Sequence, residues 1–260
     1  MGKALVYRRG ALGDTIVTFP LLEVLKRKGY EVTAVGNTDY FKIAKEVGWV
    51  DRVHYEILGD KYDCKFIISS DGNIKPFPSE REWIVTYYLS KAGFEREKFS
   101  KELPISKSEN SPLFGKVVIA PSSGSLKKVP EYEFFLELEN IIKRKGFDVI
   151  YIVGEGDEWM YEKFSPIYKI ENLITFSQHV KSSLLYIGVD SGISHLVSYL
   201  GVKSFVIFGP TDPIVWKPIG RNLKLIYTYP DCGPCFPHVC DERWCLSEEK
   251  LLKLFYSIRI

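Results

Sequence analysis

Three short segments place carboxylates, hydroxyls, glycines and lysines directly after apolar runs. Residues 10–14 follow the run 3–7, residues 121–131 follow 117–120, and residues 190–195 follow 184–189. Carboxylates can accept protons, while hydroxyls, lysines and backbone N–H groups at helix starts bind phosphate oxygens. The three segments therefore predict chemistry on an anionic ligand.

The first segment is Gly10-Ala11-Leu12-Gly13-Asp14. Gly10 and Gly13 permit a tight turn and close approach of a ligand. Asp14 is expected at the start of the first helix, where aspartate is a favoured cap. Two interpretations stay open: Asp14 only caps its helix, or it also accepts a proton from an attacking hydroxyl. The segment lacks the full G-x-G-x-x-G of a dinucleotide site.

The second segment offers Ser122, Ser123 and a positive charge from Lys127 or Lys128. Hydroxyl donors beside an ammonium are typical of a diphosphate site. The alternative is a solvated loop ahead of a helix that begins at Pro130.

The third segment takes a buried strand straight into a helix that begins with Ser191 and Gly192. Unpaired N–H groups at such a start stabilise anions. Asp190 would repel a bare phosphate, so we expect it to bind sugar hydroxyls or to orient the turn. His195 could donate to a phosphate or a hydroxyl, although a lone helical histidine is more often a core residue.

The elements that must position these segments alternate along the chain. Strands are predicted at 3–7, 31–35, 65–69, 117–120, 149–153, 184–189 and 204–208, with helices at 15–28, 40–47, 83–92, 131–145, 158–164, 191–200 and 247–258. This order predicts parallel, doubly wound α/β sheets. The polar stretch 106–115 is predicted as a linker, which gives domains 1–112 and 113–260 with a cleft between them.

Composition and cysteines narrow the function class. The net charge of +2 is too small to indicate nucleic-acid binding, and no apolar run reaches the ~20 residues of a membrane span, so we expect a cytoplasmic protein. The four cysteines that cluster, Cys232, Cys235, Cys240 and Cys245, could form disulfides, bind a metal ion or stay reduced. Only one C-x2-C pair is present, which favours metal less than disulfides.

Taken in order, these segments resemble glycosyltransferase family 9, the ADP-heptose:lipopolysaccharide heptosyltransferases. The resemblance rests on residues 9–15 with Pro20-Leu21-Leu22, on residues 188–196, on Phe208-Gly209-Pro210-Thr211-Asp212-Pro213 and on Cys232-x-x-Cys235. It implies a GT-B fold, two Rossmann-like domains facing a cleft, and inverting transfer of a heptose or similar sugar from an ADP-sugar. The implied acceptor is a lipopolysaccharide core or related glycan, at the inner face of the cytoplasmic membrane, with no cofactor.

The resemblance also assigns roles to residues. Asp14 falls on the general base, Ser122 and Ser123 on phosphate-contacting hydroxyls, and Lys127 on the lysine that neutralises the diphosphate. The remaining implied donor-site residues are Glu158 for the ribose, Phe176 near the adenine, and Asp190, Ser191, Gly192 and His195 at the donor-binding turn.

Two other function classes remain. A non-catalytic protein that binds sugar nucleotides or glycans would keep the fold, and would be favoured if Asp14 only capped its helix. A metal- or redox-responsive protein would instead be organised by the clustered cysteines.

Overall fold

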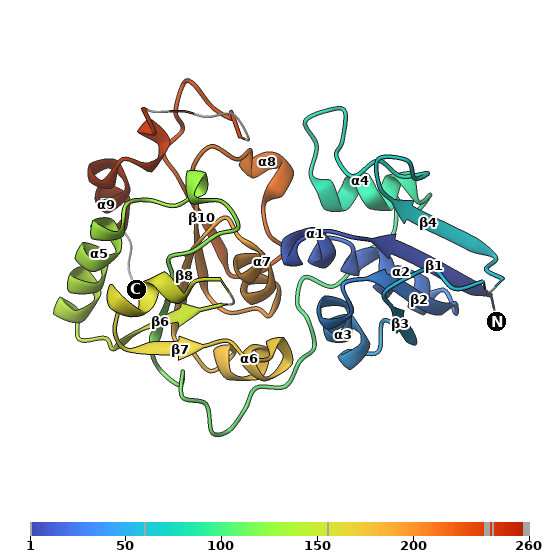
Figure 1. Ribbon diagram of the computed structural model, residues 1–260, viewed down its shortest axis with the longest axis horizontal. Helices are drawn as coiled ribbons and strands as arrows, with labels where there is room; N and C mark the ends of the chain where they lie inside the picture. The colour runs from blue at the N-terminus through green and yellow to red at the C-terminus, as the bar shows by residue number, and fades with distance from the viewer. Residues whose placement is uncertain (1, 60, 155, 237–239, 241, 257–260) are drawn as a thin grey trace. The chain divides into compact units, whose positions relative to one another are not determined.

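The computed structural model describes residues 2–59, 61–154, 156–236, 240 and 242–256, with the side chain of Glu158 also outside the description. The chain forms two compact units, one of residues 1–105 with 214–216 and one of residues 106–213 with 217–260. The sequence had predicted a division after residue 112. Figure 1 shows the ribbon of each unit, with most of the helices and strands labelled.

Unit 1 is a parallel sheet in the order β3-β2-β1-β4, covered by helices. Its strands are β1 (Lys3–Arg8), β2 (Glu31–Gly36), β3 (Arg52–His54) and β4 (Cys64–Ile68), and its helices are α1 (Leu12–Ile16), α2 (Phe19–Arg27), α3 (Thr38–Glu46) and α4 (Ile84–Lys91). The central strand β1 has Ala4, Leu5 and Val6 fully buried, because a strand covered on both faces must be apolar throughout. The short α8 (Pro213–Trp216) groups with this unit, where the Trp216 ring packs edge-on against Phe77 at 5.9 Å.

Unit 2 is a larger parallel sheet in the order β10-β9-β8-β5-β6-β7. Its strands are β5 (Val117–Ala120), β6 (Val149–Val153), β7 (Ile167–Lys169), β8 (Leu185–Val189), β9 (Ser204–Phe208) and β10 (Leu223–Tyr227). Its helices are α5 (Tyr132–Arg144), α6 (Leu173–Val180), α7 (Gly192–Tyr199) and α9 (Glu248–Tyr256), with 3-10 turns η1 (Leu126–Lys128), η2 (Glu158–Glu162) and η3 (Trp244–Leu246). Counted from β5, this is the 3-2-1-4-5-6 order of a Rossmann fold.

The order reverses beside the first strand of each unit. In unit 1 the chain moves from β1 outward to β2 and β3, then returns to the other side of β1 as β4. In unit 2 the corresponding reversal lies between β5 and β8. Ligands of open α/β sheets bind beyond the carboxyl ends of the strands at such reversals, so both positions are candidate sites.

Two predicted helices are wrong in detail. The predicted helix 15–28 is two helices, α1 and α2, separated at Val17 and Thr18. Pro20 lies in the first turn of α2, where its missing N–H costs nothing, so the chain restarts a helix there. The predicted α-helix 158–164 is the 3-10 turn η2.

Candidate functional site

The reversal in unit 2 brings the second and third segments together. Ser123 follows β5, and its hydroxyl donates to the backbone carbonyl of Asp190, which follows β8, at 2.7 Å. β5 and β8 are hydrogen-bonded neighbours, with Ala120 opposite Gly188 at their carboxyl ends. Two residues that are 67 positions apart in the sequence therefore meet at one edge of the sheet.

Asp190 is the buried charge of this region. Its side chain is 5% exposed, and its Oδ2 lies 2.9 Å from Lys128 Nζ. That contact is an ion pair without hydrogen-bond geometry. On the other side, Oδ1 lies 4.0 Å from Nε2 of His195, which is itself buried. A carboxylate removed from water needs such a counter-charge, and Lys128 supplies it here.

The third segment begins α7 as predicted. Ser191 is the N-cap residue, and its hydroxyl accepts from the backbone N–H of Ser194 at 3.3 Å. Gly192 is the first helical residue. The first N–H groups of any helix have no partner within it, which leaves this start suited to an anion.

Close packing behind the turn leaves no space for a residue larger than glycine at position 188. A Cβ at Gly188 would lie 2.3 Å from the Tyr186 hydroxyl and 2.7 Å from the Ser194 hydroxyl. These two hydroxyls bond each other at 2.9 Å, and Ser194 also donates to the carbonyl of Val189. The strand end and the first turn of α7 are thus held as one rigid piece.

The loop after β5 that carries Ser122 and Ser123, called the hydroxyl loop below, also contacts the segment that follows β6. The Ser122 hydroxyl donates to Asp157 Oδ1, and Asp157 Oδ2 accepts from the backbone N–H of Gly154 at 3.2 Å. Asp157 thus connects this loop to the segment after β6. The prediction for its neighbour Glu158 falls on a side chain outside the described part of the chain.

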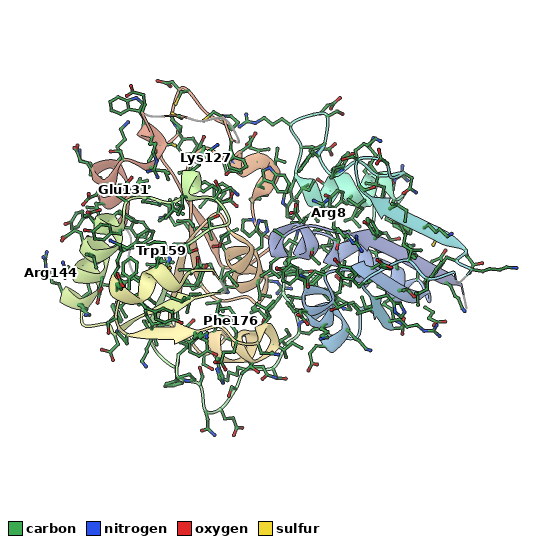
Figure 2. The ribbon with its side chains drawn as sticks, in the orientation of Figure 1. Arg8, Lys127, Glu131, Arg144, Trp159 and Phe176 are labelled. Atoms are coloured by element: carbon green, nitrogen blue, oxygen red, sulfur yellow. The ribbon has the colours of Figure 1, made fainter. Side chains whose placement is uncertain are left out.

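Lys127 and Phe176 occupy different environments (Figure 2). Lys127 is an exposed residue of η1. Phe176 lies on α6 with no exposed surface, and its ring is 6.1 Å from that of Tyr168. A ligand would meet the Phe176 ring only through the side chains that cover it, so the structure does not bring Phe176 to the surface beside the other predicted residues.

In unit 1 the first segment forms the other candidate position. Asp14 lies in α1, and its Oδ2 accepts from the backbone N–H of Ala11 at 3.0 Å. Its Oδ1 accepts from Arg8 Nη2 at 2.7 Å. The Arg8 side chain is 8% exposed and that of Asp14 25% exposed. The carboxylate thus caps its helix, holds a buried cation and still reaches solvent.

Gly10 makes room for this carboxylate. A Cβ at Gly10 would lie 2.7 Å from Asp14 Cβ and 2.9 Å from Asp14 Oδ2. Heavy atoms that close overlap, so any larger residue would push the carboxylate aside. Gly13, the other predicted glycine, lies inside α1 and bonds through its carbonyl to the N–H of Val17.

The sequence prediction missed three polar partners. Lys128 was expected only as one possible source of positive charge, and Arg8 and Asp157 were assigned no role in the site. The signals were present, since Arg8 ends the central strand, Lys128 ends η1 and Asp157 follows β6. Which acid each cation would meet depends on packing that one sequence does not give.

The cysteines are free thiols in this structure. Burial raises the pKa of the Cys245 thiol to about 11, and burial also raises the pKa of Cys235, with the neighbouring thiols adding to both shifts. Within the described residues, no three or more His, Cys, Asp or Glu side chains gather as a metal-binding group. His238, which could join the cluster, lies outside that part of the chain.

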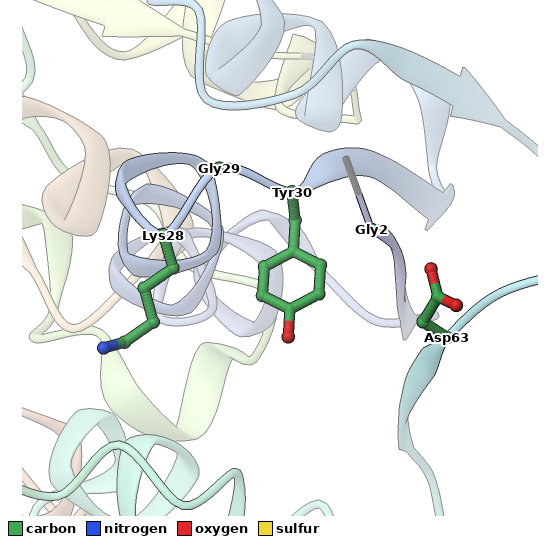
Figure 3. A pocket seen from close by; sticks show the side chains of 5 residues that line it. All are labelled: Gly2, Lys28, Gly29, Tyr30 and Asp63. Atoms are coloured by element: carbon green, nitrogen blue, oxygen red, sulfur yellow. The ribbon is translucent and has the colours of Figure 1, made fainter.

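Unit 1 also has a surface hollow that none of the candidate residues lines (Figure 3). It is lined by Gly2, Lys28, Gly29, Tyr30 and Asp63. Three of these residues directly precede strands β1, β2 and β4, so the hollow lies at the amino ends of the strands. The candidate residues lie at the carboxyl ends, where ligands of such sheets bind.

No helix in the described part of the chain has both the length and the apolar character needed to cross a bilayer.

Comparison with known proteins agrees with this architecture. The profile of glycosyltransferase family 9 (heptosyltransferase) matches residues 85–245. Lipopolysaccharide heptosyltransferase 3 of Escherichia coli is 24% identical over 118 residues, which cover 41% of this chain and 35% of that protein. The matched segment thus spans about a third of that curated relative.

Two solved structures share the fold. ADP-heptose LPS heptosyltransferase II of E. coli superposes with a TM-score of 0.72 at 13% identity, covering 97% of this chain and 99% of the other. E. coli heptosyltransferase WaaC with ADP superposes with a TM-score of 0.68 at 14% identity, covering 98% and 99%. The fold is therefore the GT-B type with two Rossmann-like domains, and the chain belongs to glycosyltransferase family 9.

Proposed function

We propose that this protein transfers a heptose, or a similar sugar, from an ADP-sugar to a sugar of the lipopolysaccharide core or a related glycan, with inversion at the anomeric carbon. The observation that carries the proposal is the hydrogen bond from Ser123 to the Asp190 carbonyl, which brings the hydroxyl loop and the start of α7 to one sheet edge. Family membership and the solved structure of WaaC with ADP support the choice of donor.

The donor's diphosphate is assigned to unit 2. The start of α7 at Ser191 and Gly192 offers backbone N–H groups, and the hydroxyl loop offers Ser122 and Ser123. Lys127, an exposed residue of η1, is assigned the positive charge that faces the diphosphate. These groups stabilise the negative charge that develops on the departing diphosphate. His195 and Asp190 are assigned to the turn that receives the donor sugar.

The nucleoside end of the donor is assigned to the segment after β6, the strand next to β5. Asp157 follows β6 and accepts a hydrogen bond from Ser122, so its carboxylate lies beside the hydroxyl loop. Carboxylates at this position of a Rossmann fold bind ribose hydroxyls. We assign this role jointly to Asp157 and Glu158.

The acceptor is assigned to unit 1, with Asp14 as the base. The acceptor hydroxyl gives its proton to the Asp14 carboxylate, while its oxygen forms the bond to the anomeric carbon. The bond from that carbon to the diphosphate oxygen breaks on the opposite face, and the electron pair leaves with ADP. Each carboxylate oxygen accepts one bond here, and each keeps a further lone pair for the proton.

One observation favours a second candidate. Asp14 accepts the N–H of Ala11 and so caps α1, as expected for a protein that binds sugar nucleotides without transferring them. The two candidates share the donor site and differ only in what Asp14 does. Activity measured with and without the Asp14 carboxylate therefore separates them.

The donor test is a titration of the purified protein with ADP, UDP, GDP and ADP-heptose, read as a shift in melting temperature. ADP compounds should raise the midpoint, because only a ligand bound to the folded state stabilises it. Lys127→Ala should reduce the ADP affinity about tenfold, whereas Lys224→Ala, which changes an exposed lysine of β10 in the same unit, should not. A larger shift with UDP or GDP would contradict the assigned donor.

The acceptor test uses heptose-deficient lipopolysaccharide core with ADP-heptose, followed by mass spectrometry and by NMR of the new anomeric linkage. A product with retained configuration would contradict inversion. The predicted cytoplasmic location, with peripheral contact at the inner membrane, is checked by cell fractionation. Recovery outside the cytoplasm and inner-membrane fractions would overturn it.

A further inference from the structure

Lys128 lies between two segments that flank the proposed donor site. It ends η1, directly after Lys127, and its side chain is 19% exposed. Its ammonium is 2.9 Å from Asp190 Oδ2 and 4.8 Å from the centroid of the Phe236 ring. A lysine over an aromatic ring gains from the negative face of that ring, and a lysine beside a buried carboxylate neutralises it.

Phe236 is fixed by the backbone rather than by its ring alone. The N–H of Phe236 donates to the carbonyl of Pro210 at 3.0 Å, and the N–H of Cys235 donates to the same carbonyl at 2.9 Å. Pro210 follows β9. The Lys128 ammonium therefore contacts Asp190, which follows β8, and Phe236, which follows β10 and is hydrogen-bonded to the segment after β9.

The contact between Lys128 and Asp190 affects ligand binding because Asp190 carries a negative charge near the proposed diphosphate site. Asp190 immediately precedes the start of α7, where the diphosphate is assigned. Without a counter-ion, its buried carboxylate would repel an incoming diphosphate and would oppose the favourable field of the helix start. Lys128 lies close enough to cancel that charge, while His195 Nε2 is more distant at 4.0 Å.

We propose that Lys128 is a positioning residue of the donor site, which neutralises Asp190 and fixes its orientation, with Phe236 holding the ammonium in place. This inference rests on the proposed function for the identity of the ligand, ADP. It assigns different tasks to adjacent lysines: Lys127 acts on the diphosphate, whereas Lys128 acts on Asp190.

The test is isothermal titration with ADP of the wild type, Lys128→Met, Asp190→Asn and the double variant. Lys128→Met should weaken ADP binding at least tenfold, because it leaves the carboxylate uncompensated. The double variant should return to within about threefold of Asp190→Asn, because the repelling charge is gone. A lysine that served only to pack the loop would leave the double variant as weak as Lys128→Met.

Further variants keep the result interpretable. Lys128→Arg should stay within about threefold of the wild type because it keeps the charge, and Lys224→Met is the matched surface control. Folding of each variant is checked by circular dichroism, and the Asp190→Asn background supplies the comparison if Lys128→Met alone is unfolded. If Lys128→Met binds ADP with wild-type affinity, the role proposed for Lys128 is wrong, while the proposed function is unaffected. No ADP binding by the wild type would overturn the proposed function together with this role of Lys128.

Discussion

Asp14→Asn separates a catalytic carboxylate from a helix cap. The asparagine side chain keeps a carbonyl oxygen, so the bond from the Ala11 N–H survives and α1 stays capped. What disappears is the negative charge that accepts a proton and faces Arg8 across 2.7 Å. The substitution therefore removes the proposed base and the ion pair with Arg8, and it keeps the cap of α1.

Two magnitudes follow for this variant. Losing a general base lowers the rate by about 100- to 10,000-fold, which is about 2.7–5.5 kcal/mol of activation free energy. The asparagine NH2 then faces the Arg8 N–H groups, so this ion pair is lost and not replaced, which costs about 1–3 kcal/mol of unfolding free energy at a side chain that is 25% exposed. For a unit of roughly one hundred residues, each kcal/mol lowers the melting midpoint by roughly 4–8 °C.

The assay measures initial rates of transfer from ADP-heptose, well below the melting midpoint, beside the ADP dissociation constant. The expected result is a large loss of rate at an unchanged ADP affinity. Asp39→Asn is the matched control, since Asp39 lies in the first turn of α3 in the same unit and is 73% exposed. Transfer by Asp14→Asn within threefold of the wild type would show that Asp14 is only a cap.

Two further predictions concern unit 1. Gly10→Ala should lower the transfer rate at least about tenfold at unchanged ADP affinity, because the added Cβ would lie 2.9 Å from Asp14 Oδ2 and displace it; an unchanged rate would contradict the requirement for this geometry. At Asp51, burial raises the pKa, but hydrogen bonds from Lys26 and the Val32 N–H outweigh it and bring the pKa below 3.8. A lowered carboxyl pKa stabilises the fold above that value and ceases to do so as the pH falls through the lowered pKa. By calorimetry, Asp51→Asn should therefore melt several degrees lower than the wild type at pH 7, and this gap should shrink as the pH falls below 3.8. A gap that stays equal between pH 7 and pH 2 would refute the argument.

The architecture followed from the alternation of apolar runs and helical patterns. All strand pairs of both sheets are parallel, as that alternation predicts. The edge strands β3, β7 and β10 were missed. Two of them have three residues each, and all three are partly exposed, so they lack the buried apolar run that marks a central strand.

The sequence predicted which strand-to-helix turns carry the candidate residues, but not how these residues pair. Strand-to-helix turns pointed to Asp14 and to the Ser191-Gly192 start because these positions follow from chain order alone. The residue types alone did not distinguish the two lysines of η1, and only the family resemblance singled out Lys127. A 3-10 turn rotates about 120° per residue, so adjacent lysines face different directions, and only the folded turn shows that Lys128 faces Asp190.

The two reversals in strand order use the same electrostatic arrangement. Each places an aspartate after a central strand, and each aspartate faces a largely buried cation, Arg8 for Asp14 and Lys128 for Asp190. Because Arg8 and Lys128 already balance the charges of these two carboxylates, a ligand can bind without having to neutralise them. In the proposed donor site, an anion at the start of α7 is stabilised by the helix N–H groups and by the exposed Lys127. The same compensation explains why losing either buried cation should harm binding or transfer more than losing an exposed charge.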